Sequence, residues 1–143
     1  MRREDRSEGF ATFPGRLRAV ALAAAARPIP PGEWGPTEVV RHLIAVEAEV
    51  HVTRLRQIAA EDEPHWSWTE PGLAAGFDDA DVTEVLEAFA AARAATVRLV
   101  GALDQDGWAR HGVHATYGHL DVEGLLRLAS DHDSEHLRGL VES

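Results

Sequence analysis

Apolar residues along this chain recur every three to four positions in four long segments, which is the spacing of amphipathic helices. The first predicted helix runs from about Phe13 to Arg27, where the proline-rich stretch Pro28–Pro31 stops it. Pro14 fits the first turn of this helix, because the first helical position needs no backbone N–H. The inward stripe consists of Phe13, Leu17, Val20, Ala21 and Ala24.

The second predicted helix has a strong start signal and continues to about Ala60. Gly35 can cap it, Pro36 occupies the first helical position, and Glu38 suits the positive end of the helix dipole. The sequence therefore predicts a helix of about 24 residues, which is roughly 36 Å long.

The third predicted helix begins near Asp81, where Asp81 and Glu84 have the spacing of a capping box. Its inward stripe is Val82, Val85, Leu86, Phe89, Arg93, Thr96, Val100 and Leu103. We expect Arg93 to extend its charged head from this stripe into solvent. The fourth predicted helix opens at Asp121 and runs to about Val141; its stripe is Leu125, Leu128, Ala129, His132, His136 and Leu140.

No useful length of the chain alternates with period two, so the pattern predicts an all-α protein, most simply a four-helix bundle. The connection from about Glu61 to Ala80 is too long for a tight helical hairpin. It can cross the whole bundle and make the second and third helices parallel. We expect His65, Trp66 and Trp68 on this linker to close an open end of the core, with substrate contact as the alternative.

Composition and charge indicate one soluble domain over residues 1–143. Apolar residues make up 45% and charged residues 27% of the chain, and residues 1–9, where Arg and acidic residues alternate, are expected to form a flexible tail. The net charge of −10 argues against nucleic-acid binding through phosphates. All fourteen basic residues are Arg, which suggests a GC-rich bacterial genome.

We expect a cytoplasmic protein, because the chain has neither an apolar run of membrane-spanning length nor a signal-peptide pattern. The chain contains no cysteine, which excludes disulfides, thiolate nucleophiles and cysteine-type zinc sites. Any metal must therefore be held by histidines and carboxylates.

The candidate chemistry begins with His132 and His136, which are four residues apart and share one face of the fourth helix. This spacing is typical of metal ligands, although an accidental pair of surface histidines would share it. Asp131 and Asp133 point to either side and are expected to be solvated or to support a ligand. The string from His132 to His136 also matches the inverted zincin pattern, but only seven residues follow His136, so we set that protease class aside.

A bundle site needs a ligand from another helix, and His42 is the natural candidate. Val39 and Val46 flank it at helical spacing, which places it on an apolar face. On a regular α-helix Glu49 shares this face, whereas His51 points to the opposite side and should be solvated. Three further histidines lie in the Gly-rich loop before the fourth helix and could line the mouth of the site: His111, His114 and His119.

Two segments resemble the DinB-like (DinB/YfiT) family of metal-dependent four-helix-bundle proteins. The segment Trp34–Leu43, with Glu47 and Glu49 downstream, is similar to the second-helix signature, and Gly118–Leu137 is similar to the fourth helix. The resemblance implies an up-down-down-up bundle, often a homodimer, with a divalent metal held by three histidines. Carried over residue by residue, these ligands are His42, His132 and His136.

Three neutral imidazoles leave an open position on the metal, as in catalytic sites. Zinc or nickel suits such a site best, and iron or manganese is an alternative. Glu49 and Glu135 are weak candidates for a general base, since such carboxylates more often orient a ligand or face solvent.

The resemblance implies an enzyme that acts on a small molecule, either a transferase using an external low-molecular-weight thiol or a hydrolase. The thiol must come from outside because the chain has no cysteine. Arg41, Arg110 and Arg138 are candidates for binding it. Two alternatives stay open: a non-catalytic, stress-related bundle with a structural metal, and a metal-free bundle in which the histidines bond to one another and to Glu49.

Overall fold

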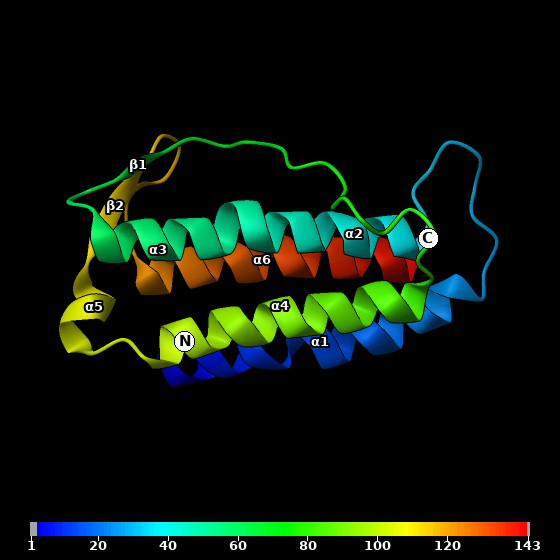
Figure 1. Ribbon diagram of the computed structural model, residues 1–143, viewed down its shortest axis with the longest axis horizontal. Coiled ribbons are helices and arrows are strands. Elements are labelled where there is room, and N and C mark those ends of the chain that lie inside the picture. Colours follow the sequence, from blue (N-terminus) through cyan, green and yellow to red (C-terminus); the bar gives the residue numbers. More distant parts are fainter. Residues whose placement is uncertain (1–2, 143) are drawn as a thin grey trace.

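The computed structural model describes residues 3–142, which form the predicted four-helix bundle (Figure 1). The bundle consists of α1 (Arg3–Ala25), the continuous segment α2 (Pro36–Val46), η1 (Glu47–His51) and α3 (Val52–Ala60), then α4 (Val82–Gly101) and α6 (Val122–Glu142). The short helix α5 (Gln105–Ala109) and three short strands, β1 (His65–Trp66), β2 (His111–His114) and β3 (Gly118–Asp121), lie at one end.

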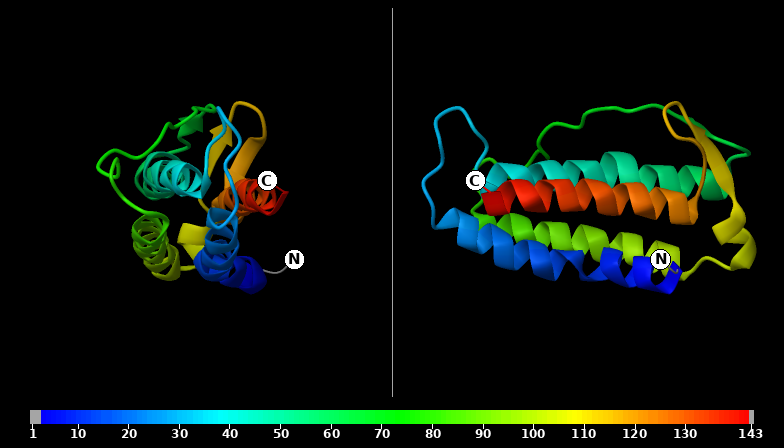
Figure 2. Two further views of the ribbon diagram at one scale, coloured as in Figure 1. Left: turned by 90° about the vertical axis from the view of Figure 1, so that its right-hand side faces the viewer. Right: turned by 180° about the vertical axis from the view of Figure 1, so that it is seen from behind.

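The order of the helices is up-down-down-up, as predicted. In Figures 1 and 2, α1 and α6 run in one direction while α2–α3 and α4 run in the other. The linker between α3 and α4 crosses the length of the bundle to allow this arrangement. None of the described helices has an apolar stretch long enough to cross a membrane.

The predicted starts of the second and third helices are also confirmed. Gly35 is the N-cap of α2, and its N–H donates to Glu38 Oε2 at 3.0 Å. Asp81 caps α4, where its Oδ1 accepts from the Glu84 N–H at 2.9 Å. These local bonds satisfy N–H groups that a helix leaves unpaired at its first turn.

The prediction for the first helix was wrong at its N-terminus. α1 begins at Arg3, so residues 3–9 are helical rather than a flexible tail; residues 1 and 2 lie outside the described part. Buried Phe10 extends the apolar stripe backwards, and Pro14 lies inside the helix. Proline cannot donate to the carbonyl four residues before it. Arg93 Nη1 donates to that carbonyl, Phe10 O, at 2.9 Å and replaces the missing bond.

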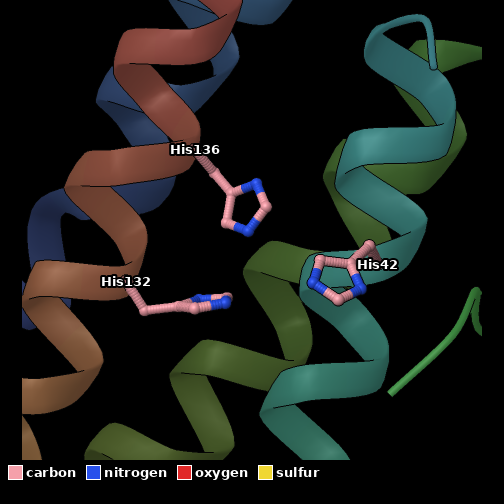
Figure 3. Close-up of side chains that lie close together, drawn as sticks. All are labelled: His42, His132 and His136. Carbon is pink, nitrogen blue, oxygen red and sulfur yellow. The ribbon is translucent and has the colours of Figure 1, made fainter. Parts of the chain in front are cut away.

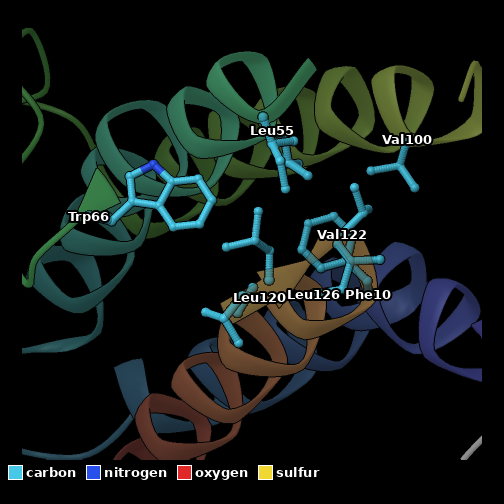
Figure 4. Close-up of a cluster of buried hydrophobic side chains, with 10 residues drawn as sticks. Phe10, Leu55, Trp66, Val100, Leu120, Val122 and Leu126 are labelled. Atoms are coloured by element: carbon cyan, nitrogen blue, oxygen red, sulfur yellow. The ribbon is translucent and has the colours of Figure 1, made fainter. Parts of the chain in front are cut away.

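A small sheet, which the sequence did not predict, closes one end of the core. β1 pairs in parallel with β2, and β2 pairs antiparallel with β3. The strands are too short to show an alternating pattern, and β2 contains a glycine, Gly112. A Cβ on Gly112 would lie 2.4 Å from the ring of Trp66, so this strand position favours glycine. Trp66 packs into the apolar cluster at this end, confirming that part of the linker closes the core (Figure 4).

The core has two apolar halves separated by a polar layer. One half lies near the sheet and includes Phe10, Leu55 and Leu126; the other includes Leu17 and Phe89. Between them along the helices lie the buried polar side chains His42, Glu47, Arg93 and Asp133. The candidate histidines belong to this layer.

Candidate metal centre

The helices bring His42, His132 and His136 together, as Figure 3 shows. One ring nitrogen of each histidine lies within 4.8 Å of the other two. His42 projects from α2 and is 1% exposed, while His132 and His136 project from α6 and are partly buried. The three ring centroids are 4.5 to 5.8 Å apart.

The backbone of the linker fixes the tautomer of His42. Its Nδ1 lies 3.1 Å from Gly72 O. A carbonyl oxygen can only accept, so Nδ1 carries a proton and donates it; in the neutral tautomer with this proton, Nε2 has the free lone pair. Metal-binding histidines are commonly oriented by a hydrogen bond of this kind.

Burial keeps the two histidines of α6 in the neutral form. Burial first, and then the neighbouring charges of His136 and His42, lower the pKa of His132 to about 4. The pKa of His136 is also lowered, again first by burial. Among the described residues, His132 Nδ1 is buried and has no hydrogen-bond partner. Neutral imidazoles with an unused nitrogen are the form that binds metal ions.

The π-helical segment η1 changes which residues of the second helix face the site. Such a segment contains one extra residue per turn, so later positions are rotated relative to a regular α-helix. Glu49 is consequently exposed and does not line the cavity, and Val50 is buried in its place. These positions contradict the prediction that Glu49 shares the His42 face.

His51 was also misplaced by counting along a regular helix. We expected it to be solvated, but its ring lies 6.2 Å from that of His132 and its Nε2 is buried without a partner among the described residues. Burial lowers its pKa well below the usual value, and the charge of Arg93 adds to this effect. His51 therefore lies next to the candidate site.

Arg93 does not extend into solvent, which contradicts our expectation for this residue. It is 1% exposed, and its Nη2 lies 3.0 Å from Glu47 Oε1 and 3.0 Å from Asp133 Oδ2. Asp133 is consequently buried rather than solvated, while Asp131 is exposed as expected. Desolvation raises the pKa of Asp133 to about 6, although Arg93 opposes the shift.

A cavity of about 600 Å³ lies beside the histidines. Its lining includes His132, His136 and Glu135 from α6, and Trp68 and Glu70 from the linker. The Trp68 indole lies 6.1 Å from His132 and donates to Glu70 Oε2 at 3.0 Å. The linker therefore does more than close the core, because Trp68 and Glu70 form one wall of the cavity.

The arginines proposed from the sequence do not line this cavity. Arg41 donates to Ala74 O, Arg110 donates to Ile58 O, and Arg138 is exposed on α6. Arg54, which the sequence analysis did not single out, lines it instead. The available signal in the sequence was that the apolar residues Val50 and Ile58 flank Arg54 at helical spacing.

The three histidines of the Gly-rich segment separate into two environments. His114 is buried and lines the cavity. His111 and His119 are exposed on the sheet, and their ring nitrogens lie within 4.8 Å of each other and of a Glu63 carboxylate oxygen. This exposed group is a second place where a metal ion could bind.

The comparisons with known proteins agree with this architecture. The sequence profile of the DinB superfamily matches residues 8–140, so the chain belongs to that superfamily. The fold resembles YfiT from Bacillus subtilis with a TM-score of 0.75 and 18% identity, covering 99% of this chain and 87% of that one. YfiT is described as a probable metal-dependent hydrolase with an unusual four-helix bundle topology. Among curated proteins, none matches this sequence.

Proposed function

We propose that the protein is a metal-dependent enzyme in which His42, His132 and His136 hold one divalent ion. The observation that carries this proposal is the convergence of three imidazole nitrogens within 4.8 Å, together with the fixed tautomer of His42. Zinc or nickel fits an all-histidine donor set best, and iron or manganese is the alternative.

The residues present fit such an ion. Two nitrogens bound to one zinc at about 2.1 Å lie about 3.4 Å apart in a tetrahedral site. The separations of up to 4.8 Å therefore need only small side-chain rotations to close on one ion. The buried, partnerless Nδ1 of His132 is a further sign that this histidine is short of a ligand or bonding partner.

A divalent ion held by neutral imidazoles lowers the pKa of a water or thiol and polarises a carbonyl group. The chain itself supplies carboxylates for proton transfer. Glu70 Oε1 lies 3.8 Å from His42 Nε2, and Glu135 lines the same cavity. We propose Glu70 as the better placed proton acceptor, with Glu135 second; the exposed Glu49 does not line the cavity.

The reaction we propose is transfer of an external thiol to a small electrophile, or hydrolysis of a small molecule. The absence of cysteine requires that any thiol come from outside the chain. The description of YfiT as a probable metal-dependent hydrolase supports the hydrolytic variant. We further propose a cytoplasmic bacterial homodimer, on the family resemblance and the composition.

The deciding experiment is elemental analysis of protein purified without an affinity tag or chelator. We expect about one equivalent of metal in the parent. It should be absent from the His42→Ala, His132→Ala double variant. A His111→Ala, His119→Ala double variant is the matched control, because it removes two histidines from the exposed group only. A parent that takes up no metal, even after incubation with zinc or nickel, contradicts the proposal.

A second candidate function is a non-catalytic, stress-related protein in which the metal ties α2 to α6. The observation in its favour is that the three histidines come from these two helices. Chelation distinguishes the candidates: a structural metal predicts a large fall in melting temperature. A catalytic metal on a well-packed bundle predicts loss of activity with little change in melting temperature.

A further inference from the structure

Arg54 is a buried cation without an acidic partner. It is 8% exposed and lines the cavity beside the histidines. Its Nη2 donates to Ser67 O at 3.3 Å, but none of the described carboxylates lies within ion-pair distance. Arg93, the other deeply buried arginine, differs because it pairs with both Glu47 and Asp133.

An unpaired buried charge is unfavourable for folding, so its presence requires an explanation. The Trp66 ring, 5.9 Å from the Arg54 guanidinium, lies near the limit of cation–π range and compensates only part of this cost. Burial lowers the pKa of Arg54, as expected for a cation that lacks a carboxylate neighbour. A group that enters the cavity from outside can supply the missing negative charge.

His114 adds a second hydrogen-bond donor near Arg54. The His114 Nδ1 accepts from the backbone N–H of Thr116 at 3.0 Å and from that of Tyr117 at 3.4 Å. The proton of the neutral ring is therefore on Nε2, which can only donate. Arg54 and His114 line the same cavity. Burial lowers the pKa of His114 first, and the charge of Arg54 lowers it second.

The other residues that line the cavity differ in charge from Arg54. Arg54 is the only arginine or lysine among the described lining residues, and the acidic side chains Glu70, Asp131 and Glu135 surround the histidine end. Apolar side chains form much of the remaining wall: Val50, Leu55, Leu125, Leu126, Leu128 and Ala129. Among the described lining residues, Arg54 is therefore the side chain that can pair with an anion away from the histidines.

We propose that the cavity binds a small amphipathic molecule carrying one carboxylate, with that carboxylate on Arg54 and His114 and the reacting end towards the histidines. The proposal rests on the proposed function, since it names the class of substrate for the same cavity. A carboxylate matches the planar fork of a guanidinium, and the apolar wall suits a short hydrocarbon chain.

Calorimetric titration of the purified protein with hexanoate and with hexanamide tests this proposal. The two probes share a chain and differ in charge. We expect hexanoate to bind at least about tenfold more tightly, because a charge-assisted bidentate bond is lost with the amide. Arg54→Gln should abolish the preference and leave hexanamide binding unchanged. Arg56→Gln is the matched control, because Arg56 is an exposed arginine on the same helix.

Two results overturn the proposal: no preference for hexanoate in the parent, or a preference that persists in Arg54→Gln. The second result would place the carboxylate on a bound metal. Arg54→Lys, which keeps the charge but not the planar fork, should retain a reduced preference and covers the case in which Arg54→Gln fails to fold. Metal content of the same samples is measured separately. An Arg54-dependent preference without metal contradicts only the proposed metal chemistry, and bound metal without the preference contradicts only the carboxylate site.

Discussion

Replacement of Arg93 by methionine should destabilise the protein strongly at neutral pH and less in mild acid. Arg93 donates to Glu47 and Asp133 and to Phe10 O, and the three side chains of this ion cluster are at most 4% exposed. Methionine fills similar space but leaves two buried carboxyl groups without a cation. Removal of one partner from a buried ion pair typically costs about 3–5 kcal/mol.

The pH dependence follows from Asp133. Its pKa is already about 6 in the folded protein, against an ordinary value of 3.8, and loss of Arg93 removes the interaction that opposes this rise. In the variant we expect Asp133 to stay protonated in the folded state while it ionises on unfolding. The unfolded state then gains about 1.4 kcal/mol for each pH unit above 3.8, so at pH 7 this ionisation costs the variant about 4 kcal/mol, against about 3 kcal/mol in the parent, where the folded pKa is about 6. At pH 5 the cost is below about 2 kcal/mol in both proteins, so Asp133 makes the replacement about 1 kcal/mol more costly at pH 7 than at pH 5. The sign is fixed, because a carboxyl with a raised folded pKa loses its contribution to stability as the pH rises.

Urea unfolding followed by circular dichroism, with chelator present, measures this effect at both pH values. Arg98→Met is the control, because Arg98 is an exposed arginine on the same helix and its removal should change stability by less than about 0.5 kcal/mol. The reasoning is refuted if Arg93→Met costs less than about 1 kcal/mol, or if its cost is equal at pH 7 and pH 5.

Three further predictions concern the histidines and Arg54. Free zinc at about one hundred times its dissociation constant should raise the free energy of unfolding of the parent by about 2.7 kcal/mol and its melting temperature by about 5–10 °C. In the same thermal melt, His132→Ala should show no such rise. Metal-free protein should lose stability as the pH falls from 6.5 towards 4, because the histidines of the unfolded chain take up protons at a higher pH than folded His132, His136 and His51 do. His132 alone lowers the free energy of unfolding by about 2–3 kcal/mol over this range. The raised pKa of Asp133 has the opposite effect and offsets part of this loss. Stability that stays constant over this range in urea titrations contradicts the assignment of neutral buried histidines. Arg54→Met should raise the free energy of unfolding by about 1–2 kcal/mol, because an apolar side chain replaces an unpaired charge. The same variant should no longer prefer hexanoate. A loss of stability would show that Arg54 has a structural partner.

The parts of the fold that depend on local spacing could be predicted from the sequence. The caps at Gly35 and Asp81 and the four apolar stripes were sufficient for the bundle, and the length of the linker allowed the up-down-down-up order that the family resemblance implied. The same spacing placed His42, His132 and His136 on inward faces. Features that depend on irregular backbone were missed, because periodicity assumes a constant rotation per residue.

The π-helical segment shows the physical reason for the missed site residues. On a regular helix Glu49 shares the face of His42 and His51 points away, and one extra residue in the turn Glu47–His51 reverses their exposure. No residue type marks the position of such an insertion. Arg54 follows this segment on the same helix, so its orientation towards the cavity could not be predicted by counting from His42.

The irregular features also form one connected system around the candidate centre. Pro14 leaves Phe10 O without its helical donor, and Arg93 supplies that donor while pairing with Glu47 and Asp133. Glu47 is the first residue of the π-helical segment, and Asp133 is adjacent to His132. Arg93 on α4 therefore links α1 to both helices that carry the histidines. The rotation of α2 and α6 about their axes sets the separation of His42 from His132. We therefore infer that this buried ion cluster fixes the relative positions of the three imidazoles. Burial of its charges has a free-energy cost that an apolar core would not incur.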